Sequence, residues 1–166
     1  PEDIVALVTA LAAGVYYQDH SDCDWQQIIA SCRKVLKDGS AKAKFSELIS
    51  SQGGDPMAEL KLATAFKIQA WQTGFIQHCD ARLIGQAAVA LGAGRQSKDD
   101  IIDHKVGLLL KKKISEYVEE GETLLEVYAN KEKDFLSVKP LLKKAIVLTK
   151  ESVASPSLIL ANNFKY

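Results

Sequence analysis

The chain has 166 residues, of which 47% are hydrophobic and 25% are charged, and these values exclude a disordered or low-complexity chain. Twenty-one basic side chains balance twenty-one acidic ones, so no net field would attract nucleic acid or an anionic membrane surface. The apolar runs are much shorter than the ~20 residues that a membrane helix needs, and no signal pattern opens the chain. We therefore expect a cytoplasmic protein.

Residues 1–18 predict a helix. Glu2 and Asp3 suit the positive end of a helix dipole, and Pro1 suits its first turn. Because Pro1 stands where an initiator methionine would, we expect a piece of a longer polypeptide. The opposite face is also apolar, so the helix should contact protein around most of its circumference. The stripe that we expect to be buried consists of Ile4, Leu7, Val8, Leu11 and Val15.

Two shorter helices should follow. Ser21 and Asp24 resemble a capping box for a helix that stops at Gly39, Ser40 would cap the next helix, and residues 53–56 would break it. Three short helices rarely share a core large enough to offset a conformational entropy of roughly 1.5 kcal/mol per residue. We therefore expect these helices to pack on protein outside this segment.

The hydrophobic period changes after residues 53–61. Apolar residues alternate over residues 62–69, which predicts a strand, and a shorter strand is expected over residues 75–79. Asp80 should then cap a helix over residues 81–91 that ends at the following glycine. The pattern thus changes from all-helical to mixed.

The fold class that we predict is α+β. A helical segment, residues 1–55, precedes an α+β domain, residues 60–166. Residues 131–144 predict a helix interrupted near Pro140. The remaining expected strands are residues 106–113, 123–129, 146–149 and 158–161.

A search for catalytic and metal-ligating patterns is mostly negative. The three histidines are scattered, and the three cysteines, which we expect to be buried free thiols, show no CxxC spacing. His78 and Cys79 are neighbours in a predicted strand and so point to opposite faces, which opposes a shared metal site. We assign no catalytic residue, no metal site and no cofactor.

The loop after residues 81–91 contains two glycines and an arginine. Gly92, Gly94 and Arg95 suggest an anion-binding loop, but such loops precede a helix and this loop follows one, so a helix C-cap is the simpler interpretation. The lysines at 111–113 are interpreted as solvated protection of a strand edge.

One alternative function is a carrier domain. Two predicted strands joined by a tight turn over residues 106–129 resemble half of a biotinyl or lipoyl carrier, with Lys131 near the place of the acylated lysine. However, the following residues predict a helix instead of a return strand, and the Met-Lys-Met of biotin carriers is absent. Another alternative is an interaction module that assembles through its N-terminal helices.

The spaced motifs resemble the C-terminal portion of the pyrimidine-nucleoside phosphorylases, the family that includes thymidine phosphorylase. The chain has KF at residues 44–45, QGGD at residues 52–55, and DA…IG.AA..LGAGR…D.ID..VG over residues 80–107. Ser115 departs from the pattern, because the family usually has glycine there. The match continues through Lys113 to Val118, Gly121, Leu124 and Asn130.

The resemblance implies reversible phosphorolysis of uridine or thymidine to the free base and pentose 1-phosphate, with phosphate as co-substrate. It also implies a homodimeric parent enzyme and N-terminal helices that belong to its α/β domain. From the likeness to half of a carrier sandwich, we expect the C-terminal domain to have a barrel-sandwich-like β region. The family's phosphate-binding and base-binding residues have no match here, so we expect the isolated chain to be inactive. Arg95 could close the substrate cleft, or it could pair structurally with Asp99 or Asp100.

Overall fold

In a computed structural model of the chain, residues 2–159 are described, and they form two compact units. The helical unit comprises residues 2–58 together with 157–159, and the mixed unit comprises Glu59–Pro156. The expected α+β class is confirmed, because helices come first and two small antiparallel sheets follow. None of the described helices is long and apolar enough to cross a membrane.

The helical unit contains α1 (Glu2–Asp19), α2 (Trp25–Lys37) and α3 (Ser40–Ser51). Its buried apolar cluster is small and consists of Ala13, Trp25 and Ile28. In α1 the buried residues are Thr9, Ala13 and Gly14, whereas the stripe of large residues expected from the sequence stays mostly exposed within this unit. Small side chains let α1 approach α2 closely, which leaves the branched residues outside.

The start of α2 differs from the expected capping box. Asp24 is the N-cap, and its carboxylate accepts the backbone N–H of Gln27 at 2.9 Å. Ser21 therefore does not cap the helix. An aspartate immediately before Trp25 supplies the capping oxygen in the right place, so a cap three residues earlier is not needed.

Helix α3 begins at Ser40 itself, so the expectation that Ser40 caps it is wrong by one residue. Gly39 occupies the N-cap position at φ 85°, and the Asp38 carboxylate accepts the backbone N–H of Ser40 at 3.0 Å. No residue of α3 is buried, and Phe45 is 61% exposed. The apolar face of α3 is thus not buried by the other described residues of the helical unit.

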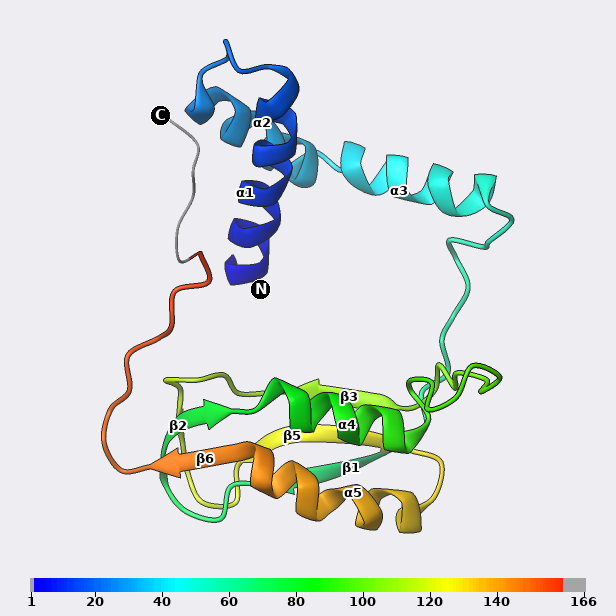
Figure 1. Cartoon of the computed structure of the whole chain (residues 1–166), viewed down its shortest axis with the longest axis vertical. Coiled ribbons are helices and arrows are strands. Elements are labelled where there is room, and N and C mark those ends of the chain that lie inside the picture. Colours follow the sequence, from blue (N-terminus) through cyan, green and yellow to red (C-terminus); the bar gives the residue numbers. More distant parts are fainter. Residues whose placement is uncertain (1, 160–166) are drawn as a thin grey trace. The chain divides into compact units, whose positions relative to one another are not determined.

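The mixed unit holds two three-stranded antiparallel sheets, with strand orders β1-β5-β3 and β4-β2-β6. Helices α4 and α5 lie side by side over one face of the first sheet (Figure 1). The elements are β1 (Thr64–Gln69), β2 (Gly74–Cys79), α4 (Ala81–Leu91), β3 (Gly107–Leu110), β4 (Tyr117–Val118), β5 (Thr123–Ala129), α5 (Glu132–Ala145) and β6 (Ile146–Thr149).

One apolar core joins both sheets to the two helices. Ile68 and Leu125 come from the first sheet, Ile76 from the second, and Leu142 from α5, and each is at most 2% exposed. The Phe66 ring also stacks on the ring of Phe135 in α5, with 4.8 Å between centroids. This shared core fixes the positions of the loops that leave α4 and β5.

Helix α5 continues through Pro140, so the expected interruption is wrong. Proline removes the N–H that would bond the Leu136 carbonyl, but Leu136 is exposed and water can satisfy that oxygen. Phe135, Val138 and Leu142 are buried on the other face and hold both halves of the helix against the core.

The last expected strand is also wrong where it can be checked. Residues 158 and 159 are not in a strand, and residues 160 and 161 lie outside the described residues. The strand expected over residues 146–149 is confirmed as β6. The two-residue strand β4 was missed, because it is too short to show a hydrophobic period.

Candidate functional site: the loop after helix α4

Both ends of α4 are capped as the sequence predicts. The Asp80 carboxylate accepts the backbone N–H groups of Arg82 at 2.9 Å and Leu83 at 3.1 Å. These hydrogen bonds, that of Leu83 first, lower the pKa of Asp80 below its ordinary value. At the other end Gly92 has φ 102°, a left-handed conformation that glycine adopts without strain. The candidate loop, residues 92–103, therefore leaves the helix at a defined point.

The two ends of this loop are hydrogen-bonded to each other. Asp103 donates its backbone N–H to the Gly92 carbonyl at 2.9 Å. Its carboxylate accepts the side-chain N–H of Asn130 at 2.7 Å and the backbone N–H of Lys105 at 2.9 Å. The Asn130 hydrogen bond is the main reason why the pKa of Asp103 lies below its ordinary value. The loop thus has a closed base.

Asp100 organises the interior of the loop. Its carboxylate accepts the backbone N–H groups of Gln96 and Ser97, both at 2.8 Å, and the Ser97 hydroxyl at 2.6 Å. The Ser97 hydroxyl contributes most to lowering the pKa of Asp100. Arg95 is exposed, and within residues 2–159 no salt bridge of Arg95 to Asp99 or Asp100 is found.

The loop lies close to the end of α4. A Cβ atom at Gly94 would be only 2.8 Å from a methyl carbon of Val89, so a larger residue would displace that side chain. Ile101 is 93% exposed. The loop, the end of α4 and Asp134 of α5 surround a shallow depression of about 370 Å³. The sequence singled out Gly92, Gly94 and Arg95 as candidates, and the structure adds the hydrogen bonds by which Asp100 and Asn130 hold the loop.

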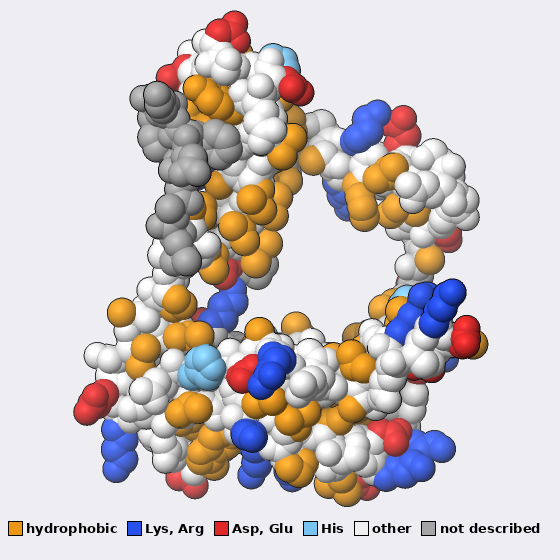
Figure 2. Space-filling model, in the orientation of Figure 1, with side chains coloured by type: hydrophobic (Ala, Val, Ile, Leu, Met, Phe, Trp, Pro, Cys, Tyr) orange, Lys and Arg blue, Asp and Glu red, His pale blue; other side chains and the backbone are white. Residues whose placement is uncertain are grey.

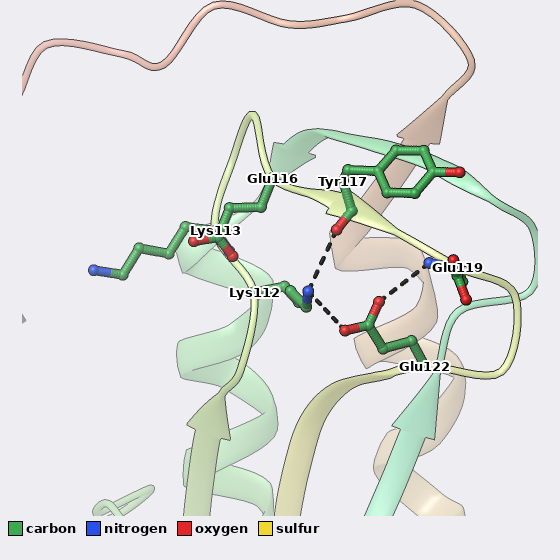
Figure 3. Close-up of polar contacts among 6 residues, drawn as sticks. All are labelled: Lys112, Lys113, Glu116, Tyr117, Glu119 and Glu122. Atoms are coloured by element: carbon green, nitrogen blue, oxygen red, sulfur yellow. Dashed lines mark hydrogen bonds and ion pairs between the residues drawn. The ribbon is translucent and has the colours of Figure 1, made fainter.

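Of the three consecutive lysines at 111–113, Lys112 has a structural role that Figure 3 shows. Strand β3 ends at Leu110, so the expectation that they lie within a strand is wrong. The Lys112 ammonium contacts a Glu122 carboxylate oxygen at 2.7 Å and the Tyr117 carbonyl at 3.3 Å. The other Glu122 oxygen accepts the backbone N–H of Glu119 at 3.1 Å. The lysine hydrogen bond is the first cause of the lowered pKa of Glu122.

Ser115 adopts φ 79° in the turn between β3 and β4. That conformation favours glycine, which is the residue that the family resemblance leads one to expect there. The turn remains closed, because Glu116 donates its N–H to the Lys113 carbonyl at 3.1 Å. Ser115 also donates its N–H to the Ile76 carbonyl at 2.9 Å, which attaches the turn to β2.

Lys131 does not lie between two strands. It is exposed and occupies the N-cap position of α5, so the chain turns from β5 directly into a helix. Cys79 is half-buried against the core, and burial raises the pKa of its thiol, whereas His78 is exposed. Among residues 2–159, no group of three or more side chains is arranged to hold a metal ion.

A second groove lies in the helical unit, and sequence reasoning did not find it. Its volume is about 320 Å³, and it contains two of the chain's cysteines. All three cysteines are free, but they are half-buried instead of fully buried. The groove is lined by Tyr16, Cys23, Gln27, Ile28, Ser31, Cys32 and Val35.

Residues 75–149 match a family model described as the pyrimidine nucleoside phosphorylase C-terminal domain. A pyrimidine-nucleoside phosphorylase of Geobacillus stearothermophilus is 33% identical over 165 residues, which are 96% of this chain and 38% of that relative. One of Bacillus subtilis is 36% identical over 138 residues, which are 80% of this chain and 32% of the relative. The chain therefore spans well under half the length of these relatives.

Proposed function

We propose, from the premise that this chain matches a C-terminal portion of the pyrimidine-nucleoside phosphorylase family, that it is the C-terminal part of such an enzyme. The intact enzyme would transfer the pentose of uridine or thymidine to phosphate and release the free base. The observation that carries this proposal is the match, which includes 96% of the chain. Positioned charges would supply most of the catalysis in such a reaction.

Within that enzyme, we assign the loop of residues 92–103 to the wall of the substrate cleft. Arg95 is the contact that would close the cleft, because it is an exposed cation on a loop whose backbone is otherwise fixed by hydrogen bonds. Gly92 and Gly94 would serve this arrangement by allowing the left-handed turn and the close approach to Val89. The isolated chain would bind neither substrate productively and would be inactive.

The partner that we propose for the helical unit is the remainder of the same enzyme. Hydrophobic side chains gather along α1 (Figure 2), and several large ones are 46% to 69% exposed. At about 25 cal/mol per Å², covering a few hundred Å² of such surface would favour association by several kcal/mol. We further propose that the intact enzyme is a homodimer and that it is located in the cytoplasm. The exposed side chains are Ile4, Val5, Val8, Leu11, Val15 and Tyr16.

Two assays test the proposal. The 166-residue chain alone should show no phosphorolysis of uridine or thymidine. Activity of the isolated chain would contradict the proposal that catalysis requires the remainder of the enzyme. In the enzyme that contains this chain, Arg95→Ala should lower kcat/KM at least about tenfold, as expected for loss of a charged contact. Lys98→Ala removes another exposed cation of the same loop and serves as the matched control. Equal effects of the two substitutions would contradict the role of Arg95.

A further inference from the structure

The base of the candidate loop is tied to a segment 27 residues away in sequence. The Asn130 side chain, between β5 and α5, donates to the Asp103 carboxylate at 2.7 Å. We propose that this pair is a latch that fixes the base of the loop and thereby positions Arg95. Asn130 and Asp103 are thus positioning residues, and their effect on activity rests on the function proposed above.

Three hydrogen bonds converge on Asp103. Its backbone N–H reaches the Gly92 carbonyl at the end of α4, and one carboxylate oxygen accepts the Lys105 N–H just before β3. The other oxygen accepts from Asn130, where β5 ends. One residue therefore connects α4, the segment leading into β3 and the β5–α5 junction, three elements that already share the core of the mixed unit.

The latch is separate from the brace that shapes the tip of the loop. Asp100 holds Gln96 and Ser97 through three hydrogen bonds, none of which involves Asp103 or Asn130. Arg95 lies in sequence between Gly94, which packs on Val89, and Gln96, which the brace holds. Its backbone is therefore restrained on both sides, while its side chain stays exposed.

A restrained loop loses less conformational freedom when it meets a ligand, so binding free energy is not spent on ordering it. The Asp103–Asn130 contact is suited to this role because a charged acceptor makes a stronger hydrogen bond than a neutral one. The Lys105 ammonium next to the carboxylate favours its ionised form as well. The latch is thus present at neutral pH.

Amide hydrogen exchange of the 166-residue chain tests the latch directly. Asn130→Ala should speed exchange of the Asp103 amide about tenfold, as expected for loss of one hydrogen bond to a charged group. The Ser97 amide, which the Asp100 brace protects, should change less than twofold. Lys131→Ala alters the neighbouring exposed residue and should leave both amides unchanged. An unchanged Asp103 amide in Asn130→Ala, or an equal change at Ser97, would overturn the latch.

A rescue variant keeps the test valid if Asn130→Ala does not fold. Asp103→Asn combined with Asn130→Asp reverses donor and acceptor and should restore the slow exchange that Asn130→Asp alone loses. In the enzyme that contains this chain, Asn130→Ala and Arg95→Ala should lower kcat/KM non-additively, since both act through Arg95. If exchange responds as expected and Arg95→Ala lowers kcat/KM but Asn130→Ala does not, the latch does not position Arg95 and the proposal is overturned. If Arg95→Ala itself leaves kcat/KM unchanged, the proposed role of Arg95 fails.

Discussion

Both units of this chain contain many large hydrophobic side chains, but they bury these side chains to very different extents. The mixed unit buries residues such as Ile68, Leu125 and Leu142 almost completely, in one cluster that includes both sheets and both helices. The helical unit buries only Ala13, Trp25 and Ile28 as apolar residues, although α1 alone carries many large hydrophobic side chains. A high content of hydrophobic residues therefore does not make a segment stable on its own unless these side chains pack together in a common core.

Topology explains the difference. Strand β1 pairs with β5, in a register that places Thr64 opposite Ala129, so distant parts of the chain enclose a common interior. Closing such long loops has an entropic cost that grows slowly with length, and the buried core offsets it. In the helical unit, most contacts among α1, α2 and α3 are between neighbours in sequence, so less surface is covered.

The largest expected effect is at Gly74, where β2 passes the end of β6. A Cβ atom there would overlap the Thr149 carbonyl oxygen and lie 3.0 Å from its carbon, and backbone cannot move aside easily. Gly74→Ala should lower the free energy of unfolding of the mixed unit by about 3 kcal/mol. Gly85→Ala, in α4, meets no atom within 4 Å and should raise it by up to about 1 kcal/mol. Urea denaturation followed by Trp71 fluorescence measures both.

Helix α5 allows a comparison of buried and exposed leucines on one element. Leu142 is fully buried, whereas Leu136 is 51% exposed. Leu142→Ala should lower the free energy of unfolding by about 3 kcal/mol, because it leaves a cavity in the shared core. Leu136→Ala should change it by less than about 0.5 kcal/mol. If chemical denaturation gave equal losses of unfolding free energy for the two variants, Leu142 would not belong to the core of the mixed unit.

A smaller effect of opposite sign is expected at Ser115. Its left-handed conformation costs roughly 1–2 kcal/mol for a residue other than glycine, and the greater freedom of unfolded glycine offsets part of the gain. Ser115→Gly should therefore raise the free energy of unfolding by about 0.5 kcal/mol. Gly121→Ala, at φ 84° with no atom within 4 Å of the added Cβ, should lower it by about 1 kcal/mol. Melting curves of the two variants should shift in opposite directions.

The smallest effect is on acid sensitivity. The pKa values of Asp80, Asp100 and Asp103 are all lowered in the folded mixed unit. The unfolded state then binds protons first, so the stabilisation is complete above the ordinary aspartate pKa and is lost as pH falls through the folded values. The Trp71 transition should move to lower urea as pH decreases below about 4. Asp80→Asn keeps a capping side chain but cannot titrate, so the urea midpoint should depend less on pH in this variant. An unchanged pH dependence of the midpoint would contradict the stabilising role of the ionised Asp80.

Local signals predicted local structure well. Asp80 and Gly92 lie at the ends of the helix that they cap, and both ends of α4 were placed correctly from sequence. The buried face of α1 was not predictable, because it depends on how closely Ala13 and Gly14 allow α2 to approach. Within the candidate site, Arg95 was identified from its motif, whereas the latch to Asn130 depends on a contact between distant segments that no local pattern shows.

One measurement tests the contrast between the two units most directly. The chain has two tryptophans, Trp25 in α2 and Trp71 between β1 and β2, so each unit carries its own fluorescent reporter. Residues 59–156 alone should unfold cooperatively in urea with the same Trp71 midpoint as the full chain, and Trp25 of the full chain should unfold at lower urea. Loss of cooperative folding in residues 59–156, or coincident Trp25 and Trp71 transitions, would contradict the account that only the mixed unit has a sufficient core.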